Sequence, residues 1–320
     1  MTLAPRVLVL AGGLSHERDV SLRSGRRVAE ALRDAGCSVV ERDVDAGLLG
    51  LLGAGTVDVV WPLLHGASGE DGAIRDVLDL AGVRYVGATP AACRTAWDKP
   101  VAAAVAAAAG LAVPEGVALP QGTFRELGAQ AVLAAIVGRF GLPLVVKPAR
   151  GGSALGASVV RDADQLPRAM VECFAYGDVA LVQRHVAGVE VAVSVVDLDG
   201  APRALPAVEI VPDGGFYGYD ARYVAGATEF FSPARLTQDA ADAVAAAALT
   251  AHRAFGLRHL SRTDLVVDAD GVPWFLEVNV APGMTETSLL PQAVEAAGED
   301  PAALYRSVVE RALGEYVLPV

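Results

Sequence analysis

Lysine is almost missing from this chain of 320 residues: it occurs only at Lys99 and Lys147, whereas arginine occurs 24 times. Arginine carries a wide planar head group, and lysine is a compact charge on a thin stem, so the two do not replace each other in narrow sites. A narrow pocket for a phosphate would keep its lysines while arginine took over elsewhere. The alternative is that two lysines survive by chance.

Cysteine is also scarce, which excludes a disulfide framework. Cys37, Cys93 and Cys173 lie far apart without a C-x-x-C pair, as is typical of buried thiols in a reducing cytoplasm. Long apolar runs are missing too, because residues 7–11 and the alanine-rich residues 101–113 are too short for a secretory leader or a membrane span. We therefore expect a cytoplasmic protein without a membrane partner.

The chain also lacks an excess of positive charge. The formal net charge is -12, so neither nucleic acid nor an anionic membrane would meet an attractive field overall. What the chain has is apolar material: 53% of its residues are hydrophobic and 20% are charged, which is enough to bury large cores. The length predicts two or three packed units.

The first part of the chain alternates between strand and helix patterns. An apolar strand is predicted over residues 6–11, followed by a helix over residues 21–35, a second strand over residues 57–63 and a second helix over residues 71–81. This alternation predicts a parallel sheet. A helix rich in alanine and valine is predicted next, over residues 100–109.

After Pro114 the pattern changes towards antiparallel strands. The segments predicted there are strands over residues 144–147, 157–160, 179–184, 189–197, 261–267 and 273–277, with an alanine-rich helix over residues 238–255. Residues 212–218, with Phe216 and Tyr217, have neither a helical nor a strand period. A loop of this length is typical of a functional segment.

The segment from Lys147 to Gly156 favours phosphate binding. A strand ends at the lysine and enters a turn with three glycines, whose backbone N–H groups can face an anion. The segment is not a P-loop, because Ala157 stands where that motif requires lysine. An ordinary hairpin turn is the alternative.

Two strands near the C-terminus carry oxygen ligands. Side chains two apart on a strand share a face, so Arg262 and Asp264 point the same way, as do Glu277 and Asn279. Leu276 and Val278 are then expected on the opposite, packed face. Two carboxylates and an amide oxygen from neighbouring strands predict a Mg²⁺ site; the alternative is a solvated strand face.

Two further segments place polar residues after predicted strands of the first unit. Glu17 follows the glycine turn after the first strand, where a carboxylate can reach a ligand, although it could also cap the following helix. His65 follows the second strand and stands beside an acidic glycine-rich loop at residues 66–72. That loop indicates a cleft, or else it is purely structural.

Taken together, these segments resemble the D-alanine–D-alanine ligases of the ATP-grasp superfamily. The matching motifs run in family order from Gly12 to Pro291, and the Gly-Gly-x-Ser-x-Glu-Arg opening and the Glu-x-Asn-x-x-Pro-Gly-Met-Thr end are specific. The resemblance implies α/β and α+β architecture in three domains. These are an N-terminal α/β substrate domain at residues 1–96, a central ATP-grasp domain at residues 97–187 and a C-terminal catalytic domain at residues 188–320. Two antiparallel sheets of the last two domains would clamp ATP.

The implied reaction uses ATP to phosphorylate the carboxylate of one D-alanine, and the amine of a second D-alanine then attacks. The dipeptide would serve peptidoglycan synthesis, and the resemblance also implies a homodimer. The resemblance implies that ATP is bound with two Mg²⁺ ions, with Mn²⁺ as an alternative. The residues implied for ATP are Lys99 and Lys147 at the phosphates, Ser153 and its loop over them, Gln183 and the backbone of Arg184 and Val186 at adenine, Glu190 at the ribose, and Arg222 in the aromatic loop. The residues implied for the metal ions are Asp264, Glu277 and Asn279.

The resemblance also implies residues for the two amino acids. The first amino acid would have its ammonium at Glu17, with His65 nearby. Arg262 and the N–H of Gly283 would stabilise the tetrahedral intermediate, and Ser288 and Leu289 would bind the second amino acid. Tyr223 would complete a hydrogen-bonded link with Ser153 and Glu17 that closes the site. That link is expected to favour an amine over a hydroxy acid as the second substrate.

The chain departs from the family pattern at four positions, which are Gln183 for glutamate, Arg222 for lysine, Ala154 for serine and Thr287 before Ser288. These changes touch the substrate pockets and leave two alternatives open. One is a related ligase making another dipeptide or a D-alanyl ester in antibiotic biosynthesis or resistance. The other is a nucleotide-binding regulator without catalysis, against which the presence of Arg262, Asp264, Glu277 and Asn279 argues.

Overall fold

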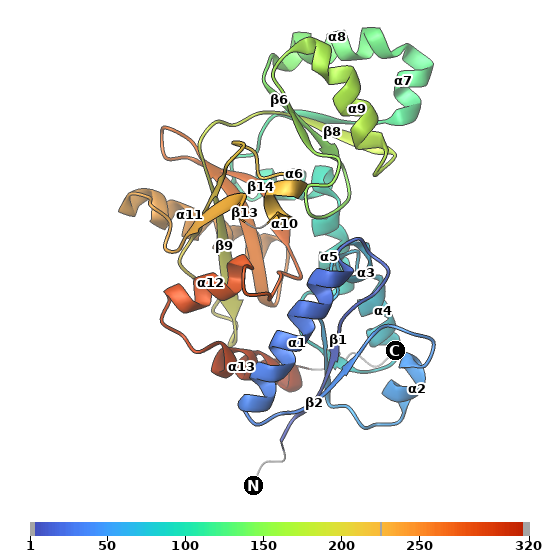
Figure 1. Cartoon of the computed structure of the whole chain (residues 1–320), viewed down its shortest axis with the longest axis vertical. Helices are drawn as coiled ribbons and strands as arrows, with labels where there is room; N and C mark the ends of the chain where they lie inside the picture. The colour runs from blue at the N-terminus through green and yellow to red at the C-terminus, as the bar shows by residue number, and fades with distance from the viewer. Residues whose placement is uncertain (1–3, 225, 316–320) are drawn as a thin grey trace.

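The computed structural model describes residues 4–224 and 226–315, except for the side chains of Asp220 and Tyr223. Three sheets lie in this part of the chain, one above the other along the longest axis of the molecule (Figure 1). One sheet is parallel and two are antiparallel, which confirms the predicted mixed architecture of three sheets. The division at residues 96 and 187 stays a prediction. No helix among the described residues is long and apolar enough to cross a membrane.

The N-terminal sheet is parallel, with strand order β2-β1-β3-β4. Its strands are β1 (Arg6–Leu10), β2 (Ser38–Arg42), β3 (Val59–Pro62) and β4 (Arg84–Tyr85), and its helices are α1 (Arg18–Asp34), α2 (Leu48–Gly53), α3 (Ala67–Glu70), α4 (Ala73–Leu80) and α5 (Pro90–Trp97). The predicted alternation of strand and helix is confirmed. Residues Val7 and Val9 face one core while Leu8 and Leu10 face another, so β1 is buried on both sides.

The second sheet is antiparallel, with strand order β5-β8-β6-β7. Its strands are β5 (Gly116–Pro120), β6 (Leu144–Pro148), β7 (Ser158–Val160) and β8 (Val179–Arg184), and its helices are α6 (Lys99–Ala108), which leads into it, α7 (Gln121–Leu127), α8 (Ala129–Phe140) and α9 (Leu166–Phe174), with a short 3-10 helix at Ala163–Gln165. Strand β8 pairs with both β5 and β6. The helices α7 to α9 cover the outer face of this sheet (Figure 1).

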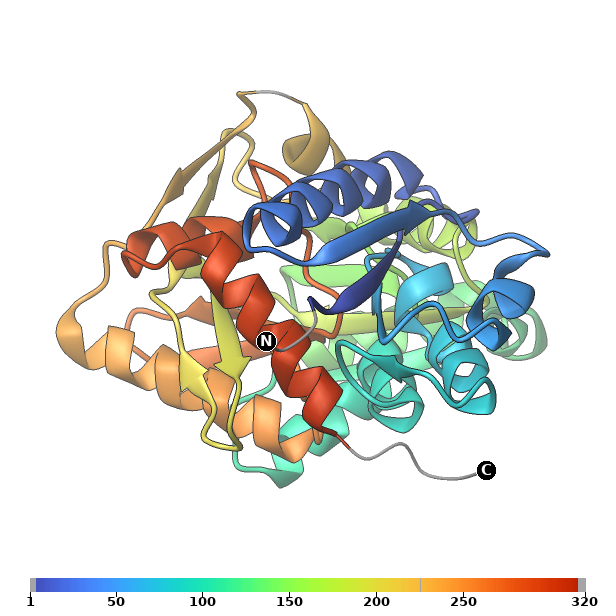
Figure 2. The ribbon, with the colours of Figure 1, turned by 90° about the horizontal axis from the view of Figure 1, so that it is seen from below.

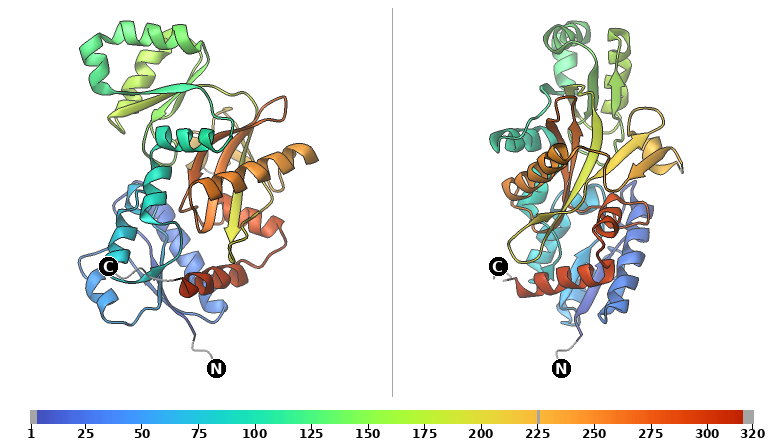
Figure 3. Two further views of the ribbon diagram at one scale, coloured as in Figure 1. Left: turned by 180° about the vertical axis from the view of Figure 1, so that it is seen from behind. Right: turned by 90° about the vertical axis from the view of Figure 1, so that its left-hand side faces the viewer.

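The third sheet has the strand order β12-β11-β9-β13-β14, and β10 pairs with β9. Its strands are β9 (Val189–Asp197), β10 (Arg203–Ala204), β11 (Val208–Pro212), β12 (Thr228–Phe231), β13 (His259–Val267) and β14 (Pro273–Asn279), and its helices are α10 (Tyr219–Tyr223), α11 (Gln238–Ala254), α12 (Leu289–Ala296) and α13 (Pro301–Gly314). Figure 3 shows α11 and α6 against the back of this sheet. The helices α1, α12 and α13 meet at its lower end (Figure 2).

The aromatic loop predicted at residues 212–218 is confirmed between β11 and α10. The short helix α10 follows it directly. The sequence pattern did not predict β5, α7, α8 or α9. Strand β5 has no buried residue, and α7 and α8 bury only one and two residues, so they lack a strong period. Helix α9 buries four residues on one face and was missed although it has this period.

Candidate active site

Two cavities meet at the centre of the molecule. The larger, about 530 Å³, lies between the second and third sheets, and the smaller, about 130 Å³, lies where the N-terminal sheet meets the chain after β14. The larger volume is within the range of about 300–1,000 Å³ that is typical of small-molecule sites. The residues that line both cavities are Lys99, Gly151, Gly152, Tyr217, Arg222 and Glu277. The boundary between the cavities is therefore rich in charge and in glycine backbone.

The two lysines of the chain lie together at this boundary. Asp98 caps the N-terminus of α6, which places Lys99 at the first helical position. Its Nζ donates a hydrogen bond to the carbonyl of Gly151 at 2.6 Å and is 3.5 Å from Glu277 Oε2. Lys147 lines the larger cavity, and desolvation there lowers its pKa to about 8. The structure thus brings both lysines to one charged site, as the sequence indicated.

The glycine-rich loop after β6 is held in an uncommon backbone conformation. Ser153 and Ala154 have φ angles of 52° and 55°, the left-handed region that non-glycine residues rarely adopt. The Ser153 hydroxyl donates a hydrogen bond to the Glu17 carboxylate. Glu17 is the N-cap residue of α1, but its side chain makes no capping hydrogen bond. The alternative of a helix-capping glutamate is therefore wrong.

The register of β13 and β14 brings the predicted oxygen ligands together. Asp264 pairs with Glu277 and Arg262 pairs with Asn279, and paired residues project from the same face of a sheet. Arg262 donates to both oxygens of Asp264, at 2.6 and 2.8 Å. The Asn279 Oδ1 accepts a hydrogen bond from the backbone of Ala281.

The charge around Glu277 favours its ionised form. Burial works to raise its pKa, but Lys99, Arg222, Lys147 and Arg262 together hold the pKa well below its usual range. No group of three His, Cys, Asp or Glu side chains in the described residues is arranged to hold a metal ion. Two carboxylates and an amide oxygen on one face nevertheless fit the donor chemistry of Mg²⁺, which takes only one or two carboxylates and completes its shell with water and phosphate.

The prediction that Leu276 faces the packed side is wrong. Asp264 pairs with Glu277, but the next residue, Leu265, pairs with Phe275, so Leu276 is an extra residue in a β-bulge. Phe275 and Val278 lie in the core behind the sheet, as predicted for Val278. The bulge turns Leu276 to the same side as Glu277, where it lines the larger cavity. A strictly alternating pattern could not reveal this apolar contact.

The larger cavity is also lined by Gln183, Arg184, Val186 and Glu190. The Gln183 Nε2 donates to the Pro114 carbonyl at 3.3 Å, which leaves its side-chain oxygen as an acceptor. The N–H of Arg184 is committed to the carbonyl of Glu115, so only the carbonyl of Arg184 can serve a ligand. Burial raises the pKa of Glu190 to about 7.

The loop before α10 closes one side of both cavities. Arg222 lies with its guanidinium 4.3 Å from the centre of the Tyr217 ring and lines both cavities. Phe216, to which no role was assigned from the sequence, lines the larger one. Tyr223 ends α10, and its side chain lies outside the described residues. The link predicted for Tyr223 with Ser153 and Glu17 therefore stays a prediction.

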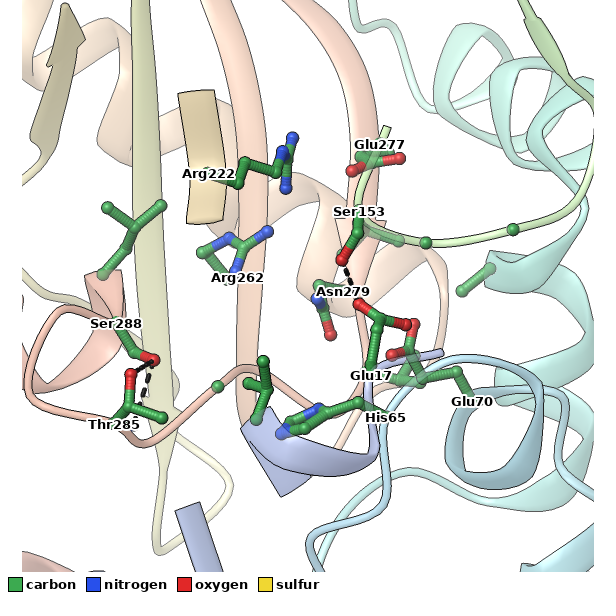
Figure 4. A pocket seen from close by; sticks show the side chains of 18 of the residues that line it. Glu17, His65, Glu70, Ser153, Arg222, Arg262, Glu277, Asn279, Thr285 and Ser288 are labelled. Atoms are coloured by element: carbon green, nitrogen blue, oxygen red, sulfur yellow. Dashed lines mark hydrogen bonds between the residues drawn. The ribbon is translucent and has the colours of Figure 1, made fainter. Parts of the chain in front are cut away.

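The smaller cavity has carboxylates at one end. Figure 4 shows Glu70 beside Glu17, with His65 below them. Burial, and then the charge of Glu17, raise the pKa of Glu70 to about 8, while burial lowers the pKa of His65 to about 4. Both groups are thus biased towards their neutral forms. The sequence indicated the loop that carries Glu70 but assigned no role to Glu70 itself.

The other end of the smaller cavity is formed by the turn before α12. Ser288 is the N-cap residue of α12, and its Oγ accepts a hydrogen bond from the Thr285 backbone at 3.0 Å and lies 2.8 Å from the Thr285 hydroxyl. Figure 4 shows this pair opposite Glu17. Gly283 and Leu289 line the same end. A Cβ at Gly283 would lie 2.7 Å from Ser288 Oγ, so a side chain there would require this hydroxyl to move.

Comparison with known proteins identifies the family. The sequence profile of the D-ala D-ala ligase C-terminus matches residues 105–310, and that of the N-terminus matches residues 51–88. The D-alanine–D-alanine ligase of Anaeromyxobacter sp. (strain K) is 42% identical over 305 residues, which are 92% of each chain.

Solved structures agree. The D-alanyl-alanine synthetase A of Vibrio cholerae has a TM-score of 0.84 and 26% identity and covers 98% of this chain and 99% of its own. The Bacillus anthracis D-alanine–D-alanine ligase complexed with ATP has a TM-score of 0.78 and 26% identity, with 97% of each chain covered. On these matches the chain belongs to the D-alanine–D-alanine ligase family.

Proposed function

We propose that the protein uses ATP to join two molecules of D-alanine into D-alanyl-D-alanine for peptidoglycan synthesis. The observation that carries the proposal is the junction of the two cavities. A cleft of nucleotide size ends at Lys99, Lys147 and the glycine loop, and a small polar cavity for amino acids begins at the same place. The D-alanine–D-alanine ligase named among the relatives favours the dipeptide over an ester product.

ATP would lie in the larger cavity with its phosphates at the two lysines. The Gln183 oxygen can accept from the amino group of adenine because its Nε2 is already committed to Pro114. Glu190 would bind the ribose, and Leu276 and Phe216 supply apolar surface for the base. Asp264, Glu277 and Asn279 would hold two Mg²⁺ ions, whose charge would offset that of the phosphates.

The first D-alanine would place its ammonium at Glu17, in the smaller cavity beside His65. One of its carboxylate oxygens would then attack the γ-phosphorus of ATP, and ADP would leave. Asp264 takes two of the five N–H donors of Arg262, and the rest remain for the oxygens of the tetrahedral intermediate.

The second D-alanine would bind at Ser288 and Leu289. Its amine nitrogen, once deprotonated, would attack the acyl carbon and form the C–N bond, and phosphate would leave. The hydrogen bond from Ser153 to Glu17 and the loop with Tyr217 and Arg222 would exclude water from the acyl phosphate.

The test is incubation of the protein with Mg-ATP and a panel of D-amino and D-hydroxy acids, with phosphate release and product mass measured. We expect D-alanyl-D-alanine as the main product at neutral pH. A product made mainly from D-lactate, or no phosphate release with D-alanine, would overturn the proposal. On the family resemblance we also propose that the protein is cytoplasmic and that it forms a homodimer. Sedimentation analysis tests the homodimer.

A further inference from the structure

Four cationic side chains line the smaller cavity, and three of them belong to the phosphate end. Lys99 contacts Glu277, Arg262 is bonded to Asp264, and Arg222 lies on Tyr217. The fourth is Arg23, an exposed residue of α1. Within the described part of the chain Arg23 forms no hydrogen bond or ion pair, although it lines the cavity. Its positive charge is therefore available to a ligand.

The neighbours of Arg23 on α1 show which part of the protein it faces. The Ser24 hydroxyl accepts a hydrogen bond from the Met284 backbone at 3.1 Å. Arg27 is 3.4 Å from Glu295 and 3.9 Å from Glu286. Residues four apart on a helix share a face, so Arg23 lies one turn before Arg27 along the same stripe.

This stripe of α1 runs beside the turn that carries the second-substrate residues. Figure 2 shows α1 next to the C-terminal segment. Arg27 is satisfied by two glutamates, but Arg23 reaches the cavity wall together with Thr285, Thr287 and Ser288. The Thr285 and Ser288 hydroxyls are neutral, so among the described residues only Arg23 offers an unpaired positive charge at this end.

The chemistry of the second substrate favours such a charge. Its amine must point to the acyl carbon near Arg262, so its carboxylate lies towards Ser288. Glu286, between the cavity-lining Thr285 and Thr287, is 3.9 Å from Arg27 and supplies no positive charge there. A carboxylate binds more strongly to a charged donor than to a neutral hydroxyl.

We propose that Arg23 binds the carboxylate of the second amino acid and makes a free carboxylate a requirement for the acceptor. This inference rests on the proposed ligase function and assigns a specificity-determining residue to it. Arg23 acts on acceptor binding, while the phosphate end of the site is left to the lysines.

The test uses the full-length wild type, Arg23→Gln and a matched control, Arg26→Gln, which removes an exposed charge from the same helix outside the cavity. The D-alanine dependence of ADP release gives separate Michaelis constants for the first and second substrates. In Arg23→Gln we expect the Michaelis constant for the second substrate to rise about three- to tenfold, which is the effect of losing a charged hydrogen bond at a partly exposed site. We expect the first constant and kcat to stay within about twofold.

D-alaninamide as the acceptor isolates the carboxylate, because it keeps the amine and lacks the negative charge. We expect Arg23→Gln to lower the yield of the D-alanine product relative to the amide product, and Arg26→Gln to leave this ratio at the wild-type value. The amines of D-alanine and D-alaninamide differ in intrinsic reactivity, but this difference is the same for every variant. It therefore does not affect the comparison of product ratios between variants. Arg23→Lys should recover part of the loss.

Two kinds of outcome are distinguishable. If the wild type releases no ADP with D-alanine, the proposed ligase function fails. If the wild type is active but Arg23→Gln leaves the Michaelis constant for the second substrate and the product ratio unchanged, the role of Arg23 is overturned. The role of Arg23 is also overturned if Arg26→Gln changes these two quantities as much as Arg23→Gln does. Equal thermal unfolding of the three proteins excludes misfolding as the cause.

Discussion

The Ser153 hydroxyl donates a hydrogen bond to the Glu17 carboxylate, although 136 residues separate them in the sequence. The bond joins the glycine loop after β6 to the start of α1 across the smaller cavity. Gly152 approaches closely as well, since a Cβ there would lie 2.8 Å from Glu17 Oε2. These contacts thus join the site that we propose for the first substrate to the loop that we propose for the phosphates.

Removal of this hydroxyl is expected to uncouple the two sites. A hydrogen bond to a charged group contributes about 1.5–3 kcal/mol, which corresponds to a factor of about 10–100. We expect Ser153→Ala to raise the Michaelis constant of the first D-alanine and to lower kcat, with a combined loss in this range. Ser158→Ala is the matched control, because the Ser158 Oγ is buried without a hydrogen-bond partner among the described residues. A loss of equal size in both variants would contradict the assignment.

The oxygen face of β13 and β14 gives a second prediction. Glu277→Gln removes one ligand charge but keeps the shape of the side chain. We expect turnover at saturating Mg²⁺ to fall by orders of magnitude while the fold is preserved. Asp268→Asn is the control, since Asp268 caps the turn between the same strands and contacts Trp274 instead of the cavity. Near-normal turnover of Glu277→Gln at high Mg²⁺ would remove the metal assignment.

Strand periodicity predicted the shared faces of the polar residues on two strands, and the family resemblance implied the roles of the other site residues. Two runs of alternating residues predict that Arg262 shares a face with Asp264 and that Glu277 shares one with Asn279. The pairing of Arg262 with Asn279 and of Asp264 with Glu277 comes from the register of the two strands. The bulge at Leu276 could not be predicted, because one unpaired residue in a strand leaves no trace in composition.

Other features depend on segments that are far apart in the chain. The pKa of Glu70 is raised because the fold buries it beside Glu17, and Arg23 reaches the cavity because α1 packs against the turn before α12. Such juxtapositions arise from tertiary packing, so a single sequence contains no local signal for them. The missed helices α7 and α8 have a different cause, because each buries at most two residues and lacks a marked apolar stripe. Helix α9, by contrast, buries Leu166, Ala169, Met170 and Cys173 at helical spacing, a period that the sequence does contain.

The two lysines give a third prediction, which depends on pH. The folded-state pKa of Lys147 is lowered from 10.5 to about 8, so the ammonium charge is present below that pH and is lost as the pH rises through it. ATP binding should therefore weaken above about pH 8. Bound phosphate stabilises the ammonium form of Lys147, so the pH at which half of that charge is lost should be higher in the complex than in the free protein. Lys147→Arg keeps its charge throughout but places a wider head group in the cleft.

We expect Lys147→Arg to bind ATP more weakly than the wild type at pH 7 and to show no change in affinity up to about pH 9.5. Isothermal titration calorimetry with ATP across this range measures both effects. Parallel pH curves for the two proteins, or an unchanged affinity at pH 7, would show that the retention of lysine at this position has no functional cause.

The last prediction concerns Gly283, where a side chain would meet Ser288. A Cβ would lie 2.7 Å from Ser288 Oγ, so Gly283→Ala requires this hydroxyl to move from its hydrogen bond with Thr285, and we expect the backbone N–H that we propose for the oxygens of the tetrahedral intermediate to shift with it. We expect a loss of kcat of about 10²–10³ if the N–H is displaced, together with weaker binding of the second D-alanine. Gly138→Ala is the matched control: it lies in α8 with nothing within 4 Å, and alanine there should stabilise the helix by about 0.5–1 kcal/mol without affecting turnover. Steady-state kinetics and thermal unfolding of both variants separate the two effects. If Gly283→Ala kept wild-type turnover, neither Gly283 nor Ser288 could hold the position proposed for it.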